Sequence, residues 1–334
     1  MIRRRTMLKG GLAALAAGAL PMKAFGQANR VNAPFPIYDT HAHFYTHEPE
    51  KYPFQAQGAR YGAERMIAKA KAKPITPEAV FDFWSQGNIL MGTGVQYNST
   101  YSTDNSYLLD CAAAHPNRIL SVVILNPLDP KTPDELRRMT KENKIAGVRF
   151  MGMPRDGDYV FFTEGARATW EAANELGIVV VLMPFGGDAN HAMGRVYDYA
   201  NRYPNLNIVL DHIGFPNPSD YPKTYGFTPM HHALAACKNV HYKYTTFLML
   251  EILDKTGVKL NEFMDYAVKL YGPDQFMWGS DIGNSEGEDF DDIAYLQKVL
   301  DASAHMPYQT RRAIFFSTAY RIFVPGGGSP VQES

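Results

Sequence analysis

Residues 37–45, IYDTHAHFY, bear most directly on the choice between the two common folds that alternate strands with helices. The stretch begins as an apolar, β-rich run and ends in two histidines, His41 and His43, which the two-residue period of a strand places on one side. A doubly wound open sheet usually has a glycine-rich turn after its first strand, and no such turn is present here. The stretch therefore favours a barrel whose first strand carries polar groups at its carboxyl end.

The rest of the chain repeats this alternation. Short runs rich in Val, Ile and Leu have the pattern of strands that are buried on both faces. Eight strands, each followed by a helix, predict an α/β fold of the (β/α)₈ TIM-barrel type. The expected strands are residues 37–43, 89–96, 119–125, 145–151, 178–183, 207–213, 240–247 and 276–281.

Helical patterns separate these runs. The first has Thr76 as its cap, Pro77 in its first turn and Gly87 after its end. An insertion, residues 44–75, is rich in Tyr, Lys and Ala, and two interpretations of it stay open, a lid or a partner surface. The expected helices are residues 76–87, 102–116, 132–143, 163–177, 191–204, 229–238, 259–272, 289–301 and 307–323.

The N-terminus has the order of an export signal, with basic residues first, an apolar run from Gly10 to Leu20 next, and small residues last. The apolar run is well short of the roughly 20 residues that span a bilayer. Arg4 and Arg5 resemble the twin-arginine motif. We predict an export signal peptide of this type over residues 1–28 and a periplasmic or exported bacterial protein, with an ordinary secretory signal as the alternative.

Composition limits the partners of this chain. Lys and Arg number 33 against 34 Asp and Glu, and no basic stripe follows the first few residues, so nucleic acid is excluded as an expected partner. We expect a small anionic organic substrate and no stable membrane insertion, and the sequence is compatible with a homo-oligomer. Cys111 and Cys237 lie in helical patterns and are predicted to be buried thiols.

Polar and ionisable residues collect where the expected strands end, which is where TIM barrels carry their chemistry. His41 and His43 end the first strand, Asp211 and His212 the sixth, and Asp281 the eighth. Packing roles remain as alternatives for single members: a structural ion pair for Arg149 of the fourth strand, a bond to Asp211 for His212, and a helix cap for Asp281. The further candidates at strand ends and in the loops that follow are Arg149, Arg155, Tyr97, Asn98 and Tyr244.

Four motifs in this order, DTHAHF, GVRF, VLDHIG and WGSDI, resemble those of the amidohydrolase superfamily. The resemblance covers residues 33–325 and leaves 326–334 as an expected flexible tail. It is strongest to the amidohydrolase-2 group, which holds 2-pyrone-4,6-dicarboxylate lactonase, sugar lactonases and aromatic acid decarboxylases. The resemblance implies a TIM barrel with its active site at the strand ends.

One ligand of the superfamily metal centre is missing. His212 and Asp281 match the expected ligands on strands six and eight, but strand five ends in Leu182, Met183 and Pro184 where a histidine is usual. The lactonase branch also lacks this histidine and is expected to work without metal, whereas the decarboxylase branch uses it. We therefore expect no required cofactor and interpret the histidine pair as catalytic and orienting imidazoles. The alternative is one Zn²⁺ or Mn²⁺ ion held by His41, His43, His212 and Asp281.

The resemblance implies a hydrolase that opens a lactone ring of a small anionic substrate. Asp281 would act as general base on a water molecule, and His212, with His41 and His43, would polarise the carbonyl and stabilise the oxyanion. Arg149 and Arg155 have the spacing of carboxylate-binding arginines of the pyrone lactonase and would clamp the anion.

The pocket itself departs from that lactonase. Tyr97, Asn98 and Tyr244 are weaker pocket candidates. Phe215 replaces a further arginine that follows the strand-six histidine there, so the pocket is expected to be less cationic and more aromatic.

Two rival functions remain. The first is a metal-dependent decarboxylase or amide hydrolase of the same superfamily. The second is a catalytically inactive periplasmic binding protein. The presence of Asp281 argues against the second, because binding alone does not need a base beside a water molecule.

Overall fold

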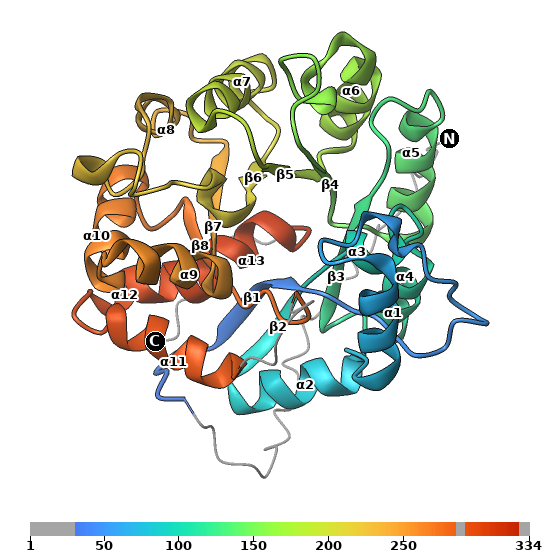
Figure 1. The fold of residues 1–334 in the computed structure, drawn as a ribbon, viewed down its shortest axis with the longest axis horizontal. Coiled ribbons are helices and arrows are strands. Elements are labelled where there is room, and N and C mark those ends of the chain that lie inside the picture. Colours follow the sequence, from blue (N-terminus) through green and yellow to red (C-terminus); the bar gives the residue numbers. More distant parts are fainter. Residues whose placement is uncertain (1–30, 285–290, 327–334) are drawn as a thin grey trace, which may run out of the picture.

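The computed structural model describes residues 31–284 and 291–326, and its eight parallel strands are hydrogen-bonded in sequence order (Figure 1). β8 lies beside β1, where Ala42 and Ile282 form a parallel bridge that closes the barrel. The predicted (β/α)₈ TIM barrel is confirmed. The strands are β1 (Ile37–Ala42), β2 (Ile89–Val95), β3 (Ile119–Ile124), β4 (Gly147–Gly152), β5 (Val179–Pro184), β6 (Ile208–Leu210), β7 (Val240–Thr245) and β8 (Phe276–Gly279).

Helices surround the sheet and cover its outer face (Figure 1). Large side chains such as Trp84 and Trp170 are fully buried between the two layers, because amphipathic helices turn their apolar faces to the strands. The helices that match the expected ones are α2 (Pro77–Gln86), α4 (Ser106–Ala114), α5 (Thr132–Asn143), α6 (Arg167–Leu176), α7 (Ala189–Arg202), α8 (Pro229–Leu234), α10 (Leu260–Tyr271) and α11 (Asp292–Ala302).

The structure adds helices that the sequence pattern did not predict. The 44–75 insertion contains α1 (Ala63–Ala72), and a single turn, α3 (Asn98–Tyr101), follows β2. The expected strand 240–247 is too long, because β7 ends at Thr245 and α9 (Thr246–Thr256) begins at once. This helix begins with an almost continuous apolar run, FLMLEIL, and such a run does not by itself distinguish a strand from a buried helix.

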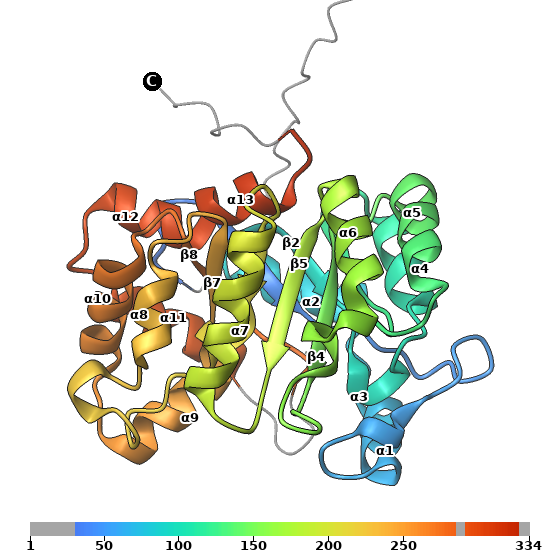
Figure 2. The same ribbon diagram turned by 90° about the horizontal axis from the view of Figure 1, so that it is seen from above.

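The last expected helix, 307–323, is divided into α12 (Tyr308–Arg312), a π-helical turn (Ala313–Ser317) and α13 (Thr318–Phe323). α13 lies across the amino-terminal end of the barrel, whereas α1, α3 and α9 lie at the opposite end (Figure 2). Phe316 and Phe323 pack with inward-facing strand residues such as Tyr38 and Val209. The barrel therefore has an apolar floor at the end opposite α1, α3 and α9 (Figure 2).

Several predictions from the sequence concern the ends of the chain. The signal peptide over residues 1–28 and all but Gly326 of the 326–334 tail lie outside the described residues. In residues 31–284 and 291–326, no helix is long and apolar enough to cross a membrane. Cys111 and Cys237 are free and buried, as predicted.

Two buried histidines that are not among the candidate site residues should make folding stability depend on pH. Burial lowers the pKa of His231 to about 4 and that of His241 to about 3, from an ordinary value of 6.5. Below pH 6.5 the unfolded chain binds protons that the folded chain does not, so each histidine should remove up to about 1.4 kcal/mol of stability per pH unit as the pH falls toward these values. Urea unfolding of metal-free protein between pH 7 and 4.5 measures this slope.

In a His241→Gln variant the free energy of unfolding should depend less steeply on pH. The slope should fall by up to about 1.4 kcal/mol per pH unit, which is the contribution of one proton. A His305→Gln variant is the control, because the His305 side chain is half exposed. Equal slopes for the His241 variant and the unaltered protein would contradict the prediction.

Candidate metal centre and active site

The first and last strands bring the candidate residues together. The Asp281 amide donates to the His41 carbonyl at 2.8 Å, and the His43 amide donates to the Ile282 carbonyl at 2.9 Å. Gly279 permits this approach, because a Cβ there would lie 2.7 Å from Thr40 Oγ1 and 3.0 Å from His41 Cβ. Barrel closure thus places residues 41, 43 and 281 side by side although they are far apart in sequence.

A buried carboxylate, Asp39, fixes the backbone beneath this contact. Its Oδ1 accepts from the amides of His41 (3.0 Å) and Ser280 (2.9 Å), and its Oδ2 accepts from Ser280 Oγ (2.6 Å) and Trp84 Nε1 (3.0 Å). The pairing of β1 with β2 shifts register between Asp39 and Ala42, so β1 is irregular where it carries the site. Asp39 therefore joins β1, β8 and α2 directly behind the candidate residues.

His43 presents one defined nitrogen to the site. Its Nδ1 lies 2.8 Å from the carbonyl oxygen of Val95, and a carbonyl only accepts, so Nδ1 carries the hydrogen. In the neutral ring Nε2 then carries a lone pair, and this atom lies 3.4 Å from Asp281 Oδ1.

His41 has the same arrangement with a different acceptor. Its Nδ1 lies 3.4 Å from Asp211 Oδ1, and its Nε2 lies 3.5 Å from the same Asp281 Oδ1 that faces His43. The ring is fully buried, and burial lowers the pKa of His41 to about 3, so the ring is neutral at neutral pH. The hydrogen belongs on Nδ1, toward the carboxylate, and Nε2 again carries a lone pair.

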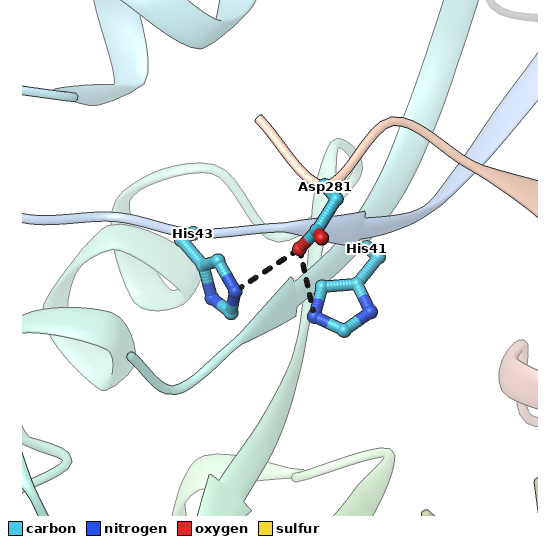
Figure 3. Close-up of side chains that lie close together, drawn as sticks. All are labelled: His41, His43 and Asp281. Carbon is cyan, nitrogen blue, oxygen red and sulfur yellow. Dashed lines mark ion pairs between the residues drawn. The ribbon is translucent and has the colours of Figure 1, made fainter. Parts of the chain in front are cut away.

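Three acceptor atoms therefore converge in a buried place with no hydrogen between them (Figure 3). Asp281 Oδ1 has no hydrogen-bond partner within the described ranges. Two imidazole lone pairs and a carboxylate oxygen that face one another repel unless a cation lies among them.

The donor set fits a divalent metal ion. His41, His43 and Asp281 offer ligand atoms that all lie within 4.8 Å of one another. Three protein ligands with an open position are typical of catalytic zinc sites, and an acceptor beside the second nitrogen of each histidine is the usual support for such ligands. The expectation of no required cofactor is therefore not supported by this geometry.

His212 lies beside the three-ligand cluster and not in it. Its Nδ1 is hydrogen-bonded to Thr245 Oγ1, which excludes the expected alternative of a bond to Asp211, and its ring centroid lies 5.8 Å from that of His41. His212 and Asp281 have φ values of 53° and 62°, in the left-handed region that is unfavourable for residues with a side chain. Such strain is concentrated at functional sites. The left-handed turn lets neighbouring residues 211 and 212 both reach the site, which a regular strand does not allow.

Arg149 is part of a buried charge cluster. Its Nε donates to Asp211 Oδ2 at 2.8 Å, and Lys243 Nζ lies 2.9 Å from Asp211 Oδ1. Burial would raise the pKa of Asp211, but Lys243 and Arg149 hold it well below its usual value. The Lys243 ammonium has its own pKa lowered by burial, which Asp211 opposes. The structural ion pair that the sequence left open for Arg149 is present.

The remaining residues that the sequence predicted for the pocket differ in burial and in their distance from the histidines. Tyr97 is buried and stacks on His43 with ring centroids 4.4 Å apart, and Asn98 begins α3 and lies against Gly58 of the insertion. Arg155 is exposed in the loop after β4. The prediction of Tyr244 as a pocket residue is not supported, because its ring packs outward among residues of α10 and β8 and is fully buried there.

A cavity of about 660 Å³ opens next to His212 at the carboxyl end of β5. Phe215 lines it and also contacts His212, with ring centroids 5.0 Å apart. Pro184 forms part of the wall, while Asp188 and Lys255 give it mixed charge. The expected aromatic character at Phe215 is present, and Phe215 separates His212 from the cavity, whose described lining does not include His212 itself.

Comparisons with known proteins agree with this architecture. The family model described as Amidohydrolase matches residues 38–324, so the chain belongs to that family. No curated protein matches the chain.

Solved structures share the fold. A proposed 2-pyrone-4,6-dicarboxylic acid hydrolase from Pseudomonas putida is 22% identical with a TM-score of 0.69, covering 88% of this chain and 99% of its own. An amidohydrolase from Burkholderia multivorans with bound zinc is 19% identical with a TM-score of 0.65, covering 86% and 99%.

A third structure is a 5-carboxyvanillate decarboxylase from Novosphingobium aromaticivorans with manganese and 4-hydroxy-3-methoxy-5-nitrobenzoic acid. It is 14% identical with a TM-score of 0.63, covering 88% and 98%. At such low identities these likenesses are evidence for the fold alone, since one barrel supports many reactions.

Sequence reasoning missed the roles of Asp39, Asp211 and Lys243. A signal was present for Lys243, because in the strand VHYKYT residues 241, 243 and 245 share one face and residues 242 and 244 the other. With Tyr244 packed outward, Lys243 must face inward. No comparable signal exists for Asp39, whose four donors come from three separate segments.

Loss of the Asp39 carboxylate should destabilise the protein strongly. An Asp39→Ala variant leaves buried donors of His41, Ser280 and Trp84 without an acceptor, and each such donor costs roughly 1–3 kcal/mol. We expect the free energy of unfolding, measured by urea titration, to fall by about 3 kcal/mol or more. Asp82→Ala, which removes an exposed acceptor of Gln86, is the control and should change it by less than about 0.5 kcal/mol. Similar values for the two variants would refute the role of Asp39.

Proposed function

We propose that this member of the amidohydrolase family is a divalent-metal-dependent hydrolase that opens the ester bond of a small lactone. The observation that carries the proposal is the convergence of His41 Nε2, His43 Nε2 and Asp281 Oδ1 without an intervening hydrogen. These three residues would hold the ion. When bound, a divalent ion acts as a Lewis acid and makes water a better nucleophile at neutral pH.

The residues of the chain supply the proton transfer and the polar contacts. Asp281 accepts the proton of the attacking water, while its Oδ2 is held by a 2.8 Å hydrogen bond from Asn284 Nδ2. With the Thr245 hydroxyl donating to His212 Nδ1, Nε2 carries the ring hydrogen and donates it to the carbonyl oxygen as negative charge develops there. Burial lowers the pKa of His212, so this contact is made by a neutral imidazole at neutral pH.

We propose that the substrate is a small anion whose charge is met by Arg155. Pro154, the residue before it, lies against Gly187 in the cavity wall, so the loop that carries Arg155 borders the cavity. Arg149 is less suited to this task, because Asp211 and Met183 already engage its guanidinium. The nitrobenzoic acid bound by the manganese-containing decarboxylase is an example of an aromatic anion held by a barrel of the same fold.

Hydrolysis is favoured over decarboxylation by the end of β5. Met183 occupies the region where the decarboxylase branch, by resemblance, uses a histidine, and its sulfur accepts from Arg149 at 2.8 Å. A thioether is a poor ligand for Zn²⁺ or Mn²⁺. An open ligand position remains in the three-residue site, which suits the activation of water.

The purified protein should contain about one equivalent of zinc or manganese, and its removal by a chelator should abolish turnover until metal is restored. Metal is measured by plasma mass spectrometry. Activity is measured with a pH indicator on a panel of carboxylated lactones and aryl carboxylic acids, because lactone opening releases a proton whereas decarboxylation releases carbon dioxide. Asp281→Asn should lower turnover by at least about a thousandfold, since it removes a ligand and the base together.

Asp265→Asn is the matched control, because Asp265 also contacts a histidine nitrogen, that of His305, at an exposed site. This variant should keep full activity and metal content. Full lactone turnover by protein with less than a tenth of an equivalent of metal would replace the proposal with a metal-independent lactonase. Carbon dioxide release without lactone opening would replace it with a decarboxylase.

We also propose that the protein is exported by the twin-arginine route to the periplasm, on the basis of Arg4 and Arg5 and the apolar run that follows. Replacing Arg4 and Arg5 together by lysine should leave the protein in the cytoplasmic fraction of the cell, as detected by immunoblotting. Arg3→Lys is the control and should be exported normally. Normal export of the double variant would exclude this route.

A further inference from the structure

Asp211 lies at the centre of a buried cluster that the proposed chemistry does not use directly. Its carboxylate is fully buried and is approached by groups from three strands. Arg149 Nε of β4 lies 2.8 Å from Oδ2, and Lys243 Nζ of β7 lies 2.9 Å from Oδ1. The third group is His41 Nδ1 of β1, 3.4 Å from Oδ1.

This arrangement limits the state of the His41 ring. A carboxylate between two cations is an acceptor only, so the ring nitrogen that faces it must carry a hydrogen. The other nitrogen, Nε2, then points its lone pair at Asp281 Oδ1, 3.5 Å away. His43 reaches the same state through a backbone carbonyl, that of Val95, which no substitution can remove. His41 depends on a side chain that can be changed.

We propose that Asp211 is a positioning residue that fixes His41 as the Nδ1–H tautomer and aims its Nε2 at the metal site, with Arg149 and Lys243 holding the carboxylate in place. The metal part of this inference rests on the proposed function. The part that concerns the tautomer of His41 does not rest on it. The proposal gives Arg149 and Lys243 a role in the site that needs no contact with substrate.

The cations explain why a carboxylate can occupy this position. An unpaired buried carboxylate is strongly unfavourable, and two cations, one bonded to Oδ2 and one ion-paired with Oδ1, offset that cost. Lys243 lies above the apolar floor, with Nζ 5.8 Å from the centre of the Phe323 ring. From the floor upward, the order is therefore apolar ring, ammonium, carboxylate, imidazole and metal site.

The test is an Asp211→Asn variant of the full chain, labelled with ¹⁵N-histidine. In metal-free unaltered protein, long-range ¹H–¹⁵N spectra should show both His41 and His43 as Nδ1–H tautomers. In the variant, His41 should lose that tautomer as its major form while His43 keeps it. Zinc affinity, measured by competition with a chromophoric chelator, should fall 10- to 100-fold, the usual effect of losing a hydrogen-bond partner of a histidine ligand.

A second variant guards against misfolding. Asp211→Asn combined with Lys243→Met removes one negative and one positive charge, so the net charge of the cluster is unchanged, and it should give the same tautomer change and loss of affinity. Asp158→Asn is the matched control, because Asp158 contacts Arg195 Nε at 3.0 Å and His191 Nε2 at 3.6 Å near the barrel surface. It should leave both measurements unaltered.

The outcomes separate the two proposals. An unchanged His41 tautomer in the Asp211 variants, or zinc affinity within twofold of the unaltered protein, would overturn the positioning role. If the unaltered protein binds no zinc or manganese, the proposed function fails, while the tautomer measurement still decides whether Asp211 positions His41.

Discussion

The repulsion among three buried acceptor atoms is the constraint on which the rest of the site depends. His41 Nε2 and His43 Nε2 both face one oxygen of Asp281 at 3.4 to 3.5 Å, in a place that water barely reaches. Without a rigid support, these three side chains would rotate until each acceptor atom faced a hydrogen-bond donor. Here they are held by β1, by β8 and by the Asp39 carboxylate that joins them, so a cation is the natural partner of the arrangement.

The barrel interior is graded in polarity along its axis, and the gradient explains how charges can be buried here. Phe316 and Phe323 close the amino-terminal end with apolar surface. Above them Lys243 and Arg149 form ion pairs with Asp211, and the imidazoles lie above these. A buried ion pair adds little stability by itself, because desolvation offsets most of the attraction. Its value in this molecule is geometric, since it fixes the groups around the metal site.

The family defines the scaffold, and the differences in side chains decide the chemistry. Barrels of this shape include a zinc-containing amidohydrolase and a manganese-containing decarboxylase, so the fold does not select the reaction. In this chain the end of β5 provides Met183 instead of a histidine, and Arg149 bonds to both Met183 and Asp211. The described residues thus form a three-ligand site with His212 at its side.

The sequence by itself determined the barrel, the order of its strands, and the first and eighth strands as carriers of site residues. These features follow from the spacing of apolar residues and from turn residues, which are local properties of the sequence. It also indicated His41, His43, His212 and Asp281 as residues of a site at the carboxyl end of the barrel, and these four residues lie close together in the structure. What it could not determine was the partner of each nitrogen and oxygen. That Arg149 pairs with Asp211, that Tyr244 faces outward, and that both histidines turn lone pairs toward Asp281 depend on contacts between strands separated by many tens of residues, and only the closed barrel sets those contacts.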